Sequence, residues 1–295
     1  MSTMIARKDP RTLYFQPPMP EQTQELPGST AAMKPRPDHG EESYRGSGRL
    51  KDCAALITGG DSGIGRAVAI AFAREGADVL VSHWKEDDDA LDTVSWIEKA
   101  GRKGLAVAGD IADETHCERL VDRAFQEFGR LDILVNNASF HVPHEQIEEW
   151  SSEQFERTFR VNLFSMFYLC KAALPRMAPG SAIINTTSIQ AYQPRGTLLD
   201  YATTKSATVG FTKALSELAI ESGVRVNAVA PGPVWTPLIP ASYGVEKVKE
   251  FGASKPLERP AQPAELAPVY VLLASAEASY ITGEVYGVTG GTMPF

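Results

Sequence analysis

The chain has 295 residues, a formal net charge of −8 at pH 7 and a hydrophobic fraction of 43%. This composition is that of a globular protein with a core, and it excludes a collagen-like or disordered chain. The acidic balance argues against nucleic acid or an anionic membrane surface as a partner. Three scattered cysteines (Cys53, Cys117, Cys170) indicate reduced thiols, no metal site and a cytoplasmic protein.

No segment of the sequence has the length of a membrane span. The longest apolar runs, such as residues 67–73, are far shorter than the roughly 20 residues that cross a bilayer. Basic residues near the N-terminus (Arg7, Lys8, Arg11) are not followed by an apolar stretch. We therefore expect no secretory signal and no membrane partner.

Residues 1–48 differ from everything after them. They hold seven of the 20 prolines and six residues of each charge, and they show no helical or strand period. Such a segment cannot bury enough apolar surface to fold by itself. Two interpretations stay open: a flexible tail, or an extension that lies as an arm across the folded body and is anchored by Tyr14, Phe15 and Tyr44.

From Arg49 onward, short apolar strands alternate with helical stretches. The strands are predicted over residues 54–58, 78–82, 105–108, 133–135, 182–187, 224–229 and 285–288. Strands this apolar need cover on both faces, which is typical of a parallel sheet between two layers of helices. We predict one α/β domain over residues 49–295, a doubly wound Rossmann-type sheet of about seven strands.

Local signals place several helix ends. Ser151, three residues before Gln154, has capping-box spacing and predicts one helix over 151–174 that stops before Pro175. Glycines in the left-handed conformation are expected just after three further helices, at Gly76, Gly101 and Gly223.

The first strand runs into a glycine-rich turn, T-G-G-D-S-G-I-G at residues 58–65, which opens an alanine-rich helix. Glycines let the backbone approach a pyrophosphate closely, and a helix N-terminus offers free N–H groups to an anion. The position between a strand and a helix distinguishes this string from an ordinary tight turn. It predicts a dinucleotide site.

Tyr201 and Lys205 lie four residues apart on one face of a predicted helix. A phenol with a pKa near 10 is a poor proton carrier at neutral pH, whereas an adjacent ammonium would lower that pKa toward 7. Because this spacing also arises by chance, its meaning depends on the surroundings. Ser188 follows the strand at 182–187, and the carboxyl ends of parallel strands are where α/β sites form.

Two groups of asparagines complete the pattern. Asn136 and Asn137 follow the buried strand at 133–135. Asn162 lies inside the predicted helix 151–174, where asparagine is unfavourable and has no evident packing role. Asn162 is therefore either a functional residue or one that faces solvent.

Taken together, these motifs resemble the classical short-chain dehydrogenase/reductase family over residues 49–291. The matching elements are T-G-x-x-x-G-x-G, Y-x-x-x-K, P-G-x-x-x-T at 231–236 and N-N-A-G, in which Ser139 replaces the last glycine. The segment at 44–50, after a proline-rich extension, resembles a bacterial subgroup of glucose-dehydrogenase-like and aldehyde-reductase-like oxidoreductases. The resemblance implies hydride transfer between NAD or NADP and a small carbonyl or alcohol substrate.

The resemblance also implies roles for single residues. In a tetrad of Asn162, Ser188, Tyr201 and Lys205, the tyrosine would exchange a proton with the substrate oxygen, which the serine would hold. Lys205 would lower the tyrosine pKa and bind the nicotinamide ribose, and Asn162 would hold a relay water. The implied cofactor contacts are Gly59, Asp61, Ser62, Gly63, Ile64, Gly65, His83, Asp110, Ile111, Asn137, Ala138, Tyr201, Lys205, Pro231, Gly232, Val234 and Thr236.

The choice between NAD and NADP stays open. No acid stands at the end of the second strand, which argues against strict NAD dependence. Asp61 and the acidic run at 86–89 argue against a 2′-phosphate, and Lys85 and Arg66 are the nearest cations.

A nucleotide-binding sensor or scaffold without turnover is the alternative function, although the presence of Tyr201 and Lys205 favours an enzyme. His141 and His144 are expected at the substrate entrance or in a surface loop and not on a metal. Residues 231–244 form either a lid over the substrate or a static packed connection. The family resemblance implies a homotetramer, for which the helices at 114–128 and 152–174 are candidates.

Overall fold

The computed structural model describes residues 8–292, and within that range seven parallel strands form one sheet. Their order, β3-β2-β1-β4-β5-β6-β7, confirms the predicted doubly wound fold. The strands are β1 (Ala54–Thr58), β2 (Asp78–His83), β3 (Gly104–Ala108), β4 (Ile133–Asn136), β5 (Ala182–Thr186), β6 (Arg225–Pro231) and β7 (Val285–Val288). The α-helices are α1 (Gly63–Arg74), α2 (Asp87–Lys99), α3 (Glu114–Phe128), α4 (Ser152–Phe159), α5 (Ser165–Ala173), α6 (Leu199–Ala219), α7 (Leu238–Ser242), α8 (Val245–Lys249) and α9 (Ala267–Ala274).

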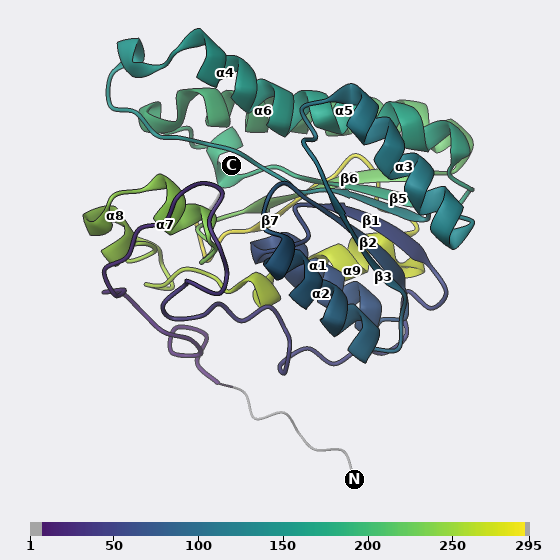
Figure 1. Ribbon diagram of the computed structural model, residues 1–295, viewed down its shortest axis with the longest axis horizontal. Coiled ribbons are helices and arrows are strands. Elements are labelled where there is room, and N and C mark those ends of the chain that lie inside the picture. The colour runs from purple at the N-terminus through teal and green to yellow at the C-terminus, as the bar shows by residue number, and fades with distance from the viewer. Residues whose placement is uncertain (1–7, 293–295) are drawn as a thin grey trace.

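The sheet is covered on both faces. Helices α1, α2 and α9 lie on one side of it, and α3, α4, α5 and α6 lie on the other (Figure 1). Because successive side chains of a strand point to opposite faces, β1 packs against the helices of both layers. Ala55 and Ile57 belong to the apolar cluster under α1 and α9, whereas Leu56 belongs to the cluster under α3 and α5.

The strand order reverses between β1 and β4. The chain proceeds outward from β1 through β2 to β3 and then returns to pair β4 with the other edge of β1. In open α/β sheets, ligands bind outside the carboxyl ends of the strands at such a point. Here Thr58 Oγ1 accepts hydrogen bonds from the N–H groups of Asn137 (3.0 Å) and Ala138 (3.1 Å), which ties the two strand ends together.

The long helix predicted over 151–174 is interrupted. Ser151 caps α4 as predicted, its Oγ accepting from Gln154 N at 3.1 Å, but a π-helical segment (Arg160–Phe164) separates α4 from α5. Pro175 lies in a 3₁₀ turn after α5. A π-segment within a helix often marks a functional site. The predicted glycine caps hold, with positive φ at Gly76, Gly101 and Gly223.

Residues 8–48, called the arm below, lie against the body of the molecule as an irregular extended segment (Figure 1). Arm residues Met19 and Met33 are buried in a small apolar cluster with Trp235, Ile239 and Val248. The arm therefore obtains from the body the apolar cover that its own composition does not supply.

Polar contacts secure the arm at its carboxyl end. The buried carboxylate of Glu75, just after α1, accepts hydrogen bonds from Tyr44 Oη (2.6 Å), Ser47 N (2.8 Å) and Arg49 N (3.0 Å). Although burial opposes it, this set of donors lowers the pKa of Glu75 to about 2. Tyr14 donates to Asp38 at 2.8 Å within the arm.

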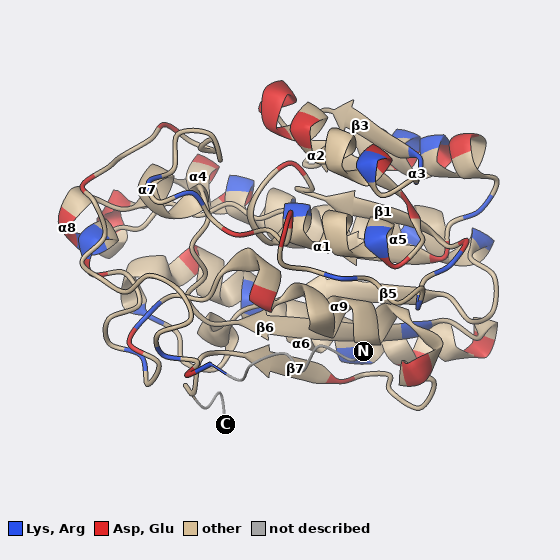
Figure 2. Cartoon of the chain, turned by 90° about the horizontal axis from the view of Figure 1, so that it is seen from below, with Lys and Arg blue, Asp and Glu red and all other residues tan. Residues whose placement is uncertain are grey.

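Charges are distributed over the surface in mixed sign, and acidic residues gather at the first turn of α2 (Figure 2). Carboxylates at a helix N-terminus are favoured by the helix dipole. Across residues 8–292, the helices fall short of the length and apolar character that a membrane span requires.

Candidate functional site

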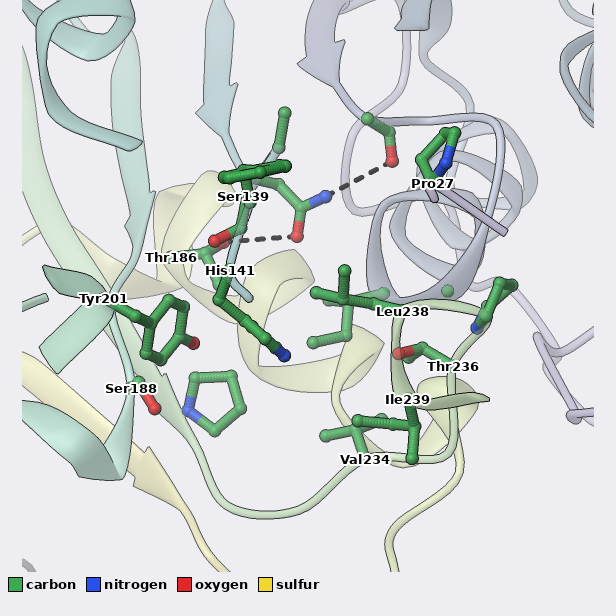
Figure 3. A pocket seen from close by; sticks show the side chains of 18 of the residues that line it. Pro27, Ser139, His141, Thr186, Ser188, Tyr201, Val234, Thr236, Leu238 and Ile239 are labelled. Carbon is green, nitrogen blue, oxygen red and sulfur yellow. Dashed lines mark hydrogen bonds between the residues drawn. The ribbon is translucent and has the colours of Figure 1, made fainter. Parts of the chain in front are cut away.

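A cavity of about 490 Å³ opens at the carboxyl ends of the strands. Its walls come from the glycine-rich turn, the ends of β4 and β5, the start of α6 and the segment after β6 (Figure 3). Every predicted cofactor contact except Gly65 lines this cavity. Of the predicted tetrad, Ser188, Tyr201 and Lys205 line it and Asn162 does not.

The glycine-rich turn presents backbone N–H groups to the cavity. Gly59 (φ +62°) and Gly63 (φ +51°) adopt the left-handed conformation that side chains disfavour. A Cβ on Gly63 would stand 2.9 Å from Thr236 Cγ2. Among the described residues, no side chain caps the first turn of α1, whereas α3 is capped by Asp113. Uncapped donors and a positive dipole end fit the pyrophosphate of a dinucleotide.

Gly65 acts differently from the prediction. It faces away from the cavity, and a Cβ there would collide with the carbonyl oxygen of Gly59 and lie 2.7 Å from Asn137 Nδ2. Asn137 Nδ2 in turn donates to the carbonyl oxygens of Thr58 (3.1 Å) and Gly59 (3.3 Å). Gly65 therefore lets α1 pack closely against the turn and does not itself line the cofactor site.

Ser188 and Tyr201 meet at the cavity wall. Both side chains line the cavity, where the Ser188 hydroxyl acts on the phenol to lower its pKa, and Ser188 Oγ accepts from Gln190 N at 3.1 Å. Asp200, which sequence reasoning missed, accepts from Tyr201 N (2.7 Å) and from Thr158 Oγ1 of α4 (2.6 Å). These bonds fix the start of α6 and thus the direction of the tyrosine.

Lys205 lies beneath the tyrosine with its ammonium inside the protein. Its Nζ donates to the carbonyl oxygen of Thr186 at 2.9 Å and stands 5.4 Å from the centroid of the Tyr201 ring. Only 2% of the residue is exposed, and burial lowers the pKa of Lys205 to about 7. A charge without a carboxylate partner is costly in such surroundings.

The predicted lowering of the tyrosine pKa is wrong. Burial raises the pKa of Tyr201, and the hydrogen bond from Ser188 offsets only part of that shift. The prediction considered the attraction between phenolate and ammonium but not the loss of solvation that both groups suffer when buried together. At neutral pH the phenol therefore carries its proton.

Asn162 lies in the π-segment with its side chain fully used by the protein. Its Oδ1 accepts from Phe140 N (2.7 Å) and Ser139 Oγ (3.3 Å), and its Nδ2 donates to Phe140 O (2.9 Å) and Thr204 Oγ1 (3.2 Å). The side chain therefore connects the loop after β4 with α6 through hydrogen bonds. The residue does not face solvent, and both polar atoms of its side chain are bonded to other parts of the protein.

The outer end of the cavity is lined by charges of both signs. Asp110 accepts from Arg157 Nη1 at 2.6 Å, and Arg157 lies over the Trp84 ring, 5.1 Å from its centroid. The acids Asp61 and Glu86 also line this end. Sequence reasoning missed Arg157, because it comes from α4, and no local motif marks it.

Neither of the two cations considered for a 2′-phosphate, Arg66 and Lys85, is among the residues that line this cavity. Arg66 is fully buried and pairs with Glu41 of the arm (3.3 Å) and with Asp92 of α2, so its charge is already matched. Lys85 stacks on the Trp84 ring, with Nζ 4.0 Å from the centroid.

His141 lies beside the tyrosine and points into the cavity (Figure 3). The two rings meet edge to face, with centroids 5.0 Å apart. Neither ring nitrogen finds a hydrogen-bond partner among residues 8–292, and burial lowers the pKa of His141 to about 4. His144 points elsewhere, to Gln154 Oε1 at 2.7 Å. Of these two histidines, His141 is therefore the one placed to contact a substrate.

One stretch of the cavity wall comes from the arm. Leu26 and Pro27 line the cavity together with the glycine-rich turn and with residues 236–239. Nothing in the sequence links this proline-rich stretch to the glycine-rich turn or to residues 236–239, which come much later in the chain. Its partners become visible only in the folded structure.

The chain is similar to known oxidoreductases along most of its length. The family model described as Enoyl-(Acyl carrier protein) reductase matches residues 59–293. The chain is 52% identical to "Uncharacterized oxidoreductase YhdF" of Bacillus subtilis (strain 168), over 92% of this chain and 94% of that protein. It is 45% identical to "NADPH-dependent aldehyde reductase 1, chloroplastic" of Arabidopsis thaliana, over 90% of this chain and 95% of that protein.

Solved structures agree with the sequence relatives. A short chain dehydrogenase from Burkholderia cenocepacia J2315, in complex with NADP, superposes with a TM-score of 0.78 at 30% identity. The match covers 82% of this chain and 98% of that chain. The part left unmatched has about the size of the arm.

Proposed function

Since the chain belongs to the short-chain dehydrogenase/reductase family, its activity is an NAD- or NADP-dependent oxidoreduction, and we propose that Ser188, Tyr201 and Lys205 carry it out on a carbonyl or alcohol group. The observation that carries this proposal is that Ser188, Tyr201 and Lys205 line one wall of a cavity that also contains the uncapped N-terminus of α1. When bound, the nicotinamide supplies or accepts the hydride.

The proton moves through Tyr201. In carbonyl reduction the protonated phenol donates to the substrate oxygen, and in alcohol oxidation the same oxygen returns the proton. Ser188 donates a hydrogen bond to the substrate oxygen and so holds it against the phenol. Its orientation is set by the bond that it accepts from Gln190 N.

Lys205 contributes to this step by binding the cofactor. Its amine keeps donors beyond the one that it gives to Thr186, and we assign these to a hydroxyl of the nicotinamide ribose. Asn162 contributes by position: it fixes the loop that carries Ser139 and His141 relative to α6. The unpartnered nitrogens of His141 favour a substrate with a polar group beyond the reacting oxygen.

Replacing the phenol tests the proposal. Tyr201→Phe removes only the hydroxyl, so we expect turnover of the best aldehyde or ketone found by an absorbance screen with NADH and NADPH to fall by about 10²–10⁴-fold. Dinucleotide affinity, measured by fluorescence titration, should stay within about threefold, because the bulk of the site is unchanged.

Tyr168→Phe makes the same chemical change on α5, outside the cavity, and should leave turnover unaltered. Turnover of Tyr201→Phe close to that of the unsubstituted chain would show that another group transfers the proton.

We also propose that the protein is a homotetramer. Large apolar side chains are exposed along α4, the π-segment and α5, and around the end of α6: Phe155, Phe164, Phe167, Leu218 and Ile220. Exposed large apolar side chains of this kind are typical of an interface. Among the described residues α3 exposes no large apolar side chain, so α6 replaces it as the expected partner of the α4–α5 face.

We also propose a cytoplasmic location, because the cysteines are free thiols. All three cysteines are free, and Cys117 and Cys170 are buried. Reduced thiols of this kind are typical of a reducing compartment.

A further inference from the structure

The arm is hydrogen-bonded to two helices beside the cavity, α7 and α2. On one side, Gln24 N donates to the carbonyl oxygen of Pro240 in α7 at 2.9 Å. On the other, Thr30 N donates to Asp89 Oδ2 in α2 at 2.7 Å, and Thr30 is fully buried there. Residues 24–30, called the strap below, thus connect the segment after β6 with the helix after β2.

The strap lines the same cavity as the glycine-rich turn. Leu26 and Pro27 share that cavity with Gly59 and residues 61–64, and Figure 3 shows Pro27 on the side of the cavity where Thr236 and Leu238 lie. Gly28 has φ +88°, and a Cβ on it would stand 2.6 Å from the carbonyl oxygen of Pro237. The strap therefore fits closely against the residue that follows Thr236.

Contacts at both ends hold the strap in place. Met19 and Met33 flank it in sequence and are buried with Trp235 and Ile239. Trp235 Nε1 also donates to the carbonyl oxygen of Pro35 at 2.8 Å. Lifting the strap breaks backbone hydrogen bonds and loosens this apolar cluster, so it requires an opening event with its own free-energy cost.

We propose that residues 24–30 are part of the cofactor site, with Leu26 and Pro27 covering the pyrophosphate end, and that the strap must open before a dinucleotide enters or leaves. The proposal rests on the proposed function only in that the dinucleotide occupies this cavity. The apolar cover opposite the N-terminus of α1 excludes water from the anion, which strengthens the attraction of the helix N–H groups. Exchange of the cofactor then follows the opening of the strap.

Two variants of the full chain release the strap from different ends. Gly28→Ala introduces a Cβ against Pro237, and Asp89→Ala removes the acceptor of Thr30. Each has a matched control. Gly48 in the arm has φ +85° with no neighbour within 4 Å among the described residues, so Gly48→Ala adds the same backbone strain without the collision. Asp88→Ala removes an equal charge from the exposed neighbour in α2.

The measurement is the dissociation rate constant of NADH and of NADPH, followed by stopped-flow fluorescence during displacement by excess oxidised dinucleotide. We expect it to rise at least about fivefold in Gly28→Ala and in Asp89→Ala and to stay below that in both controls. A smaller rise in either strap variant, or an equal rise in its control, overturns the proposal.

Two further outcomes are informative. Binding of neither dinucleotide to the unsubstituted chain would contradict the proposed function and the strap with it, whereas binding with unchanged rates contradicts the strap alone. A thermal melt of each variant shows whether the fold persists, and if one strap variant unfolds, the other decides the question.

Discussion

At the scale of residues, the site is dominated by the burial of two ionisable groups side by side. Lys205 has no carboxylate partner among the described residues and relies on the carbonyl oxygen of Thr186. Burial accordingly moves the pKa of the lysine down and that of Tyr201 up. Both shifts favour neutral side chains, so the phenol is ready to donate a proton at neutral pH, as carbonyl reduction requires.

The lowered pKa of Lys205 predicts a specific dependence of stability on pH. Its folded pKa of about 7 is below the ordinary value of 10.5, so between these values the unfolded chain binds a proton that the folded chain does not. The contribution of Lys205 to the free energy of unfolding therefore rises with pH through this window, at up to about 1.4 kcal/mol per pH unit. Below pH 7 the destabilisation is complete.

Lys205→Met removes this titration. Denaturant unfolding from pH 7 to 10, without added dinucleotide, should show the unsubstituted chain gaining stability relative to Lys205→Met as the pH rises. A difference between the two proteins that stays constant over this range would mean that the ammonium keeps its ordinary pKa.

Residue-level features of the site were predictable to different degrees. The spacing of Tyr201 and Lys205 and the position of Ser188 after a strand were sufficient to predict their meeting, because helix and sheet geometry fix where they lie. The direction in which the tyrosine pKa shifts could not be predicted, since desolvation depends on how much protein packs around the pair. Asp200 and Arg157 carry no local motif, and their partners are remote in sequence.

At the scale of elements, the π-segment between α4 and α5 serves the site through Asn162. Periodicity predicts one continuous helix there, because the apolar spacing does not change at residue 160. The interruption coincides with four hydrogen bonds that the Asn162 side chain makes, two as acceptor and two as donor, with the loop after β4 and with α6. Since those partners come from other elements, the sequence of the helix itself does not reveal them.

The arm is the other element that sequence alone left undecided. Its composition excludes independent folding, which is compatible with either a tail or an ordered extension. The contacts that order it lie on α1, α2, α7 and the segment after β6: Glu75, Asp89, Pro240 and Trp235. A segment without hydrophobic periodicity cannot be placed from its own sequence, because its position depends on such partners.

At the scale of the whole molecule, the sheet follows from the alternation of apolar strands and helices, and its register brings the strand ends to one edge. That alternation predicted the parallel sheet and the position of the site. It did not predict how molecules associate, because exposed faces are set by which side chains the core leaves uncovered. Phe167, half-exposed on α5, is one of the side chains left uncovered in this way.

Phe167→Asp tests the proposed assembly. A charge on this face should prevent its burial against another subunit, so the molar mass measured by light scattering after size exclusion should fall below that of a tetramer. Leu91→Asp places the same charge on an exposed leucine of α2, in the other helical layer, and should leave the tetramer intact. A tetramer that survives Phe167→Asp would move the interface elsewhere.

The most direct measurement is a crystal structure of the chain with its dinucleotide bound. We expect the nicotinamide ring inside the cavity, next to the hydroxyls of Ser188 and Tyr201, and the pyrophosphate against the N–H groups that open α1. A ring bound outside this cavity, or separated from Tyr201 by other side chains, would contradict this expectation.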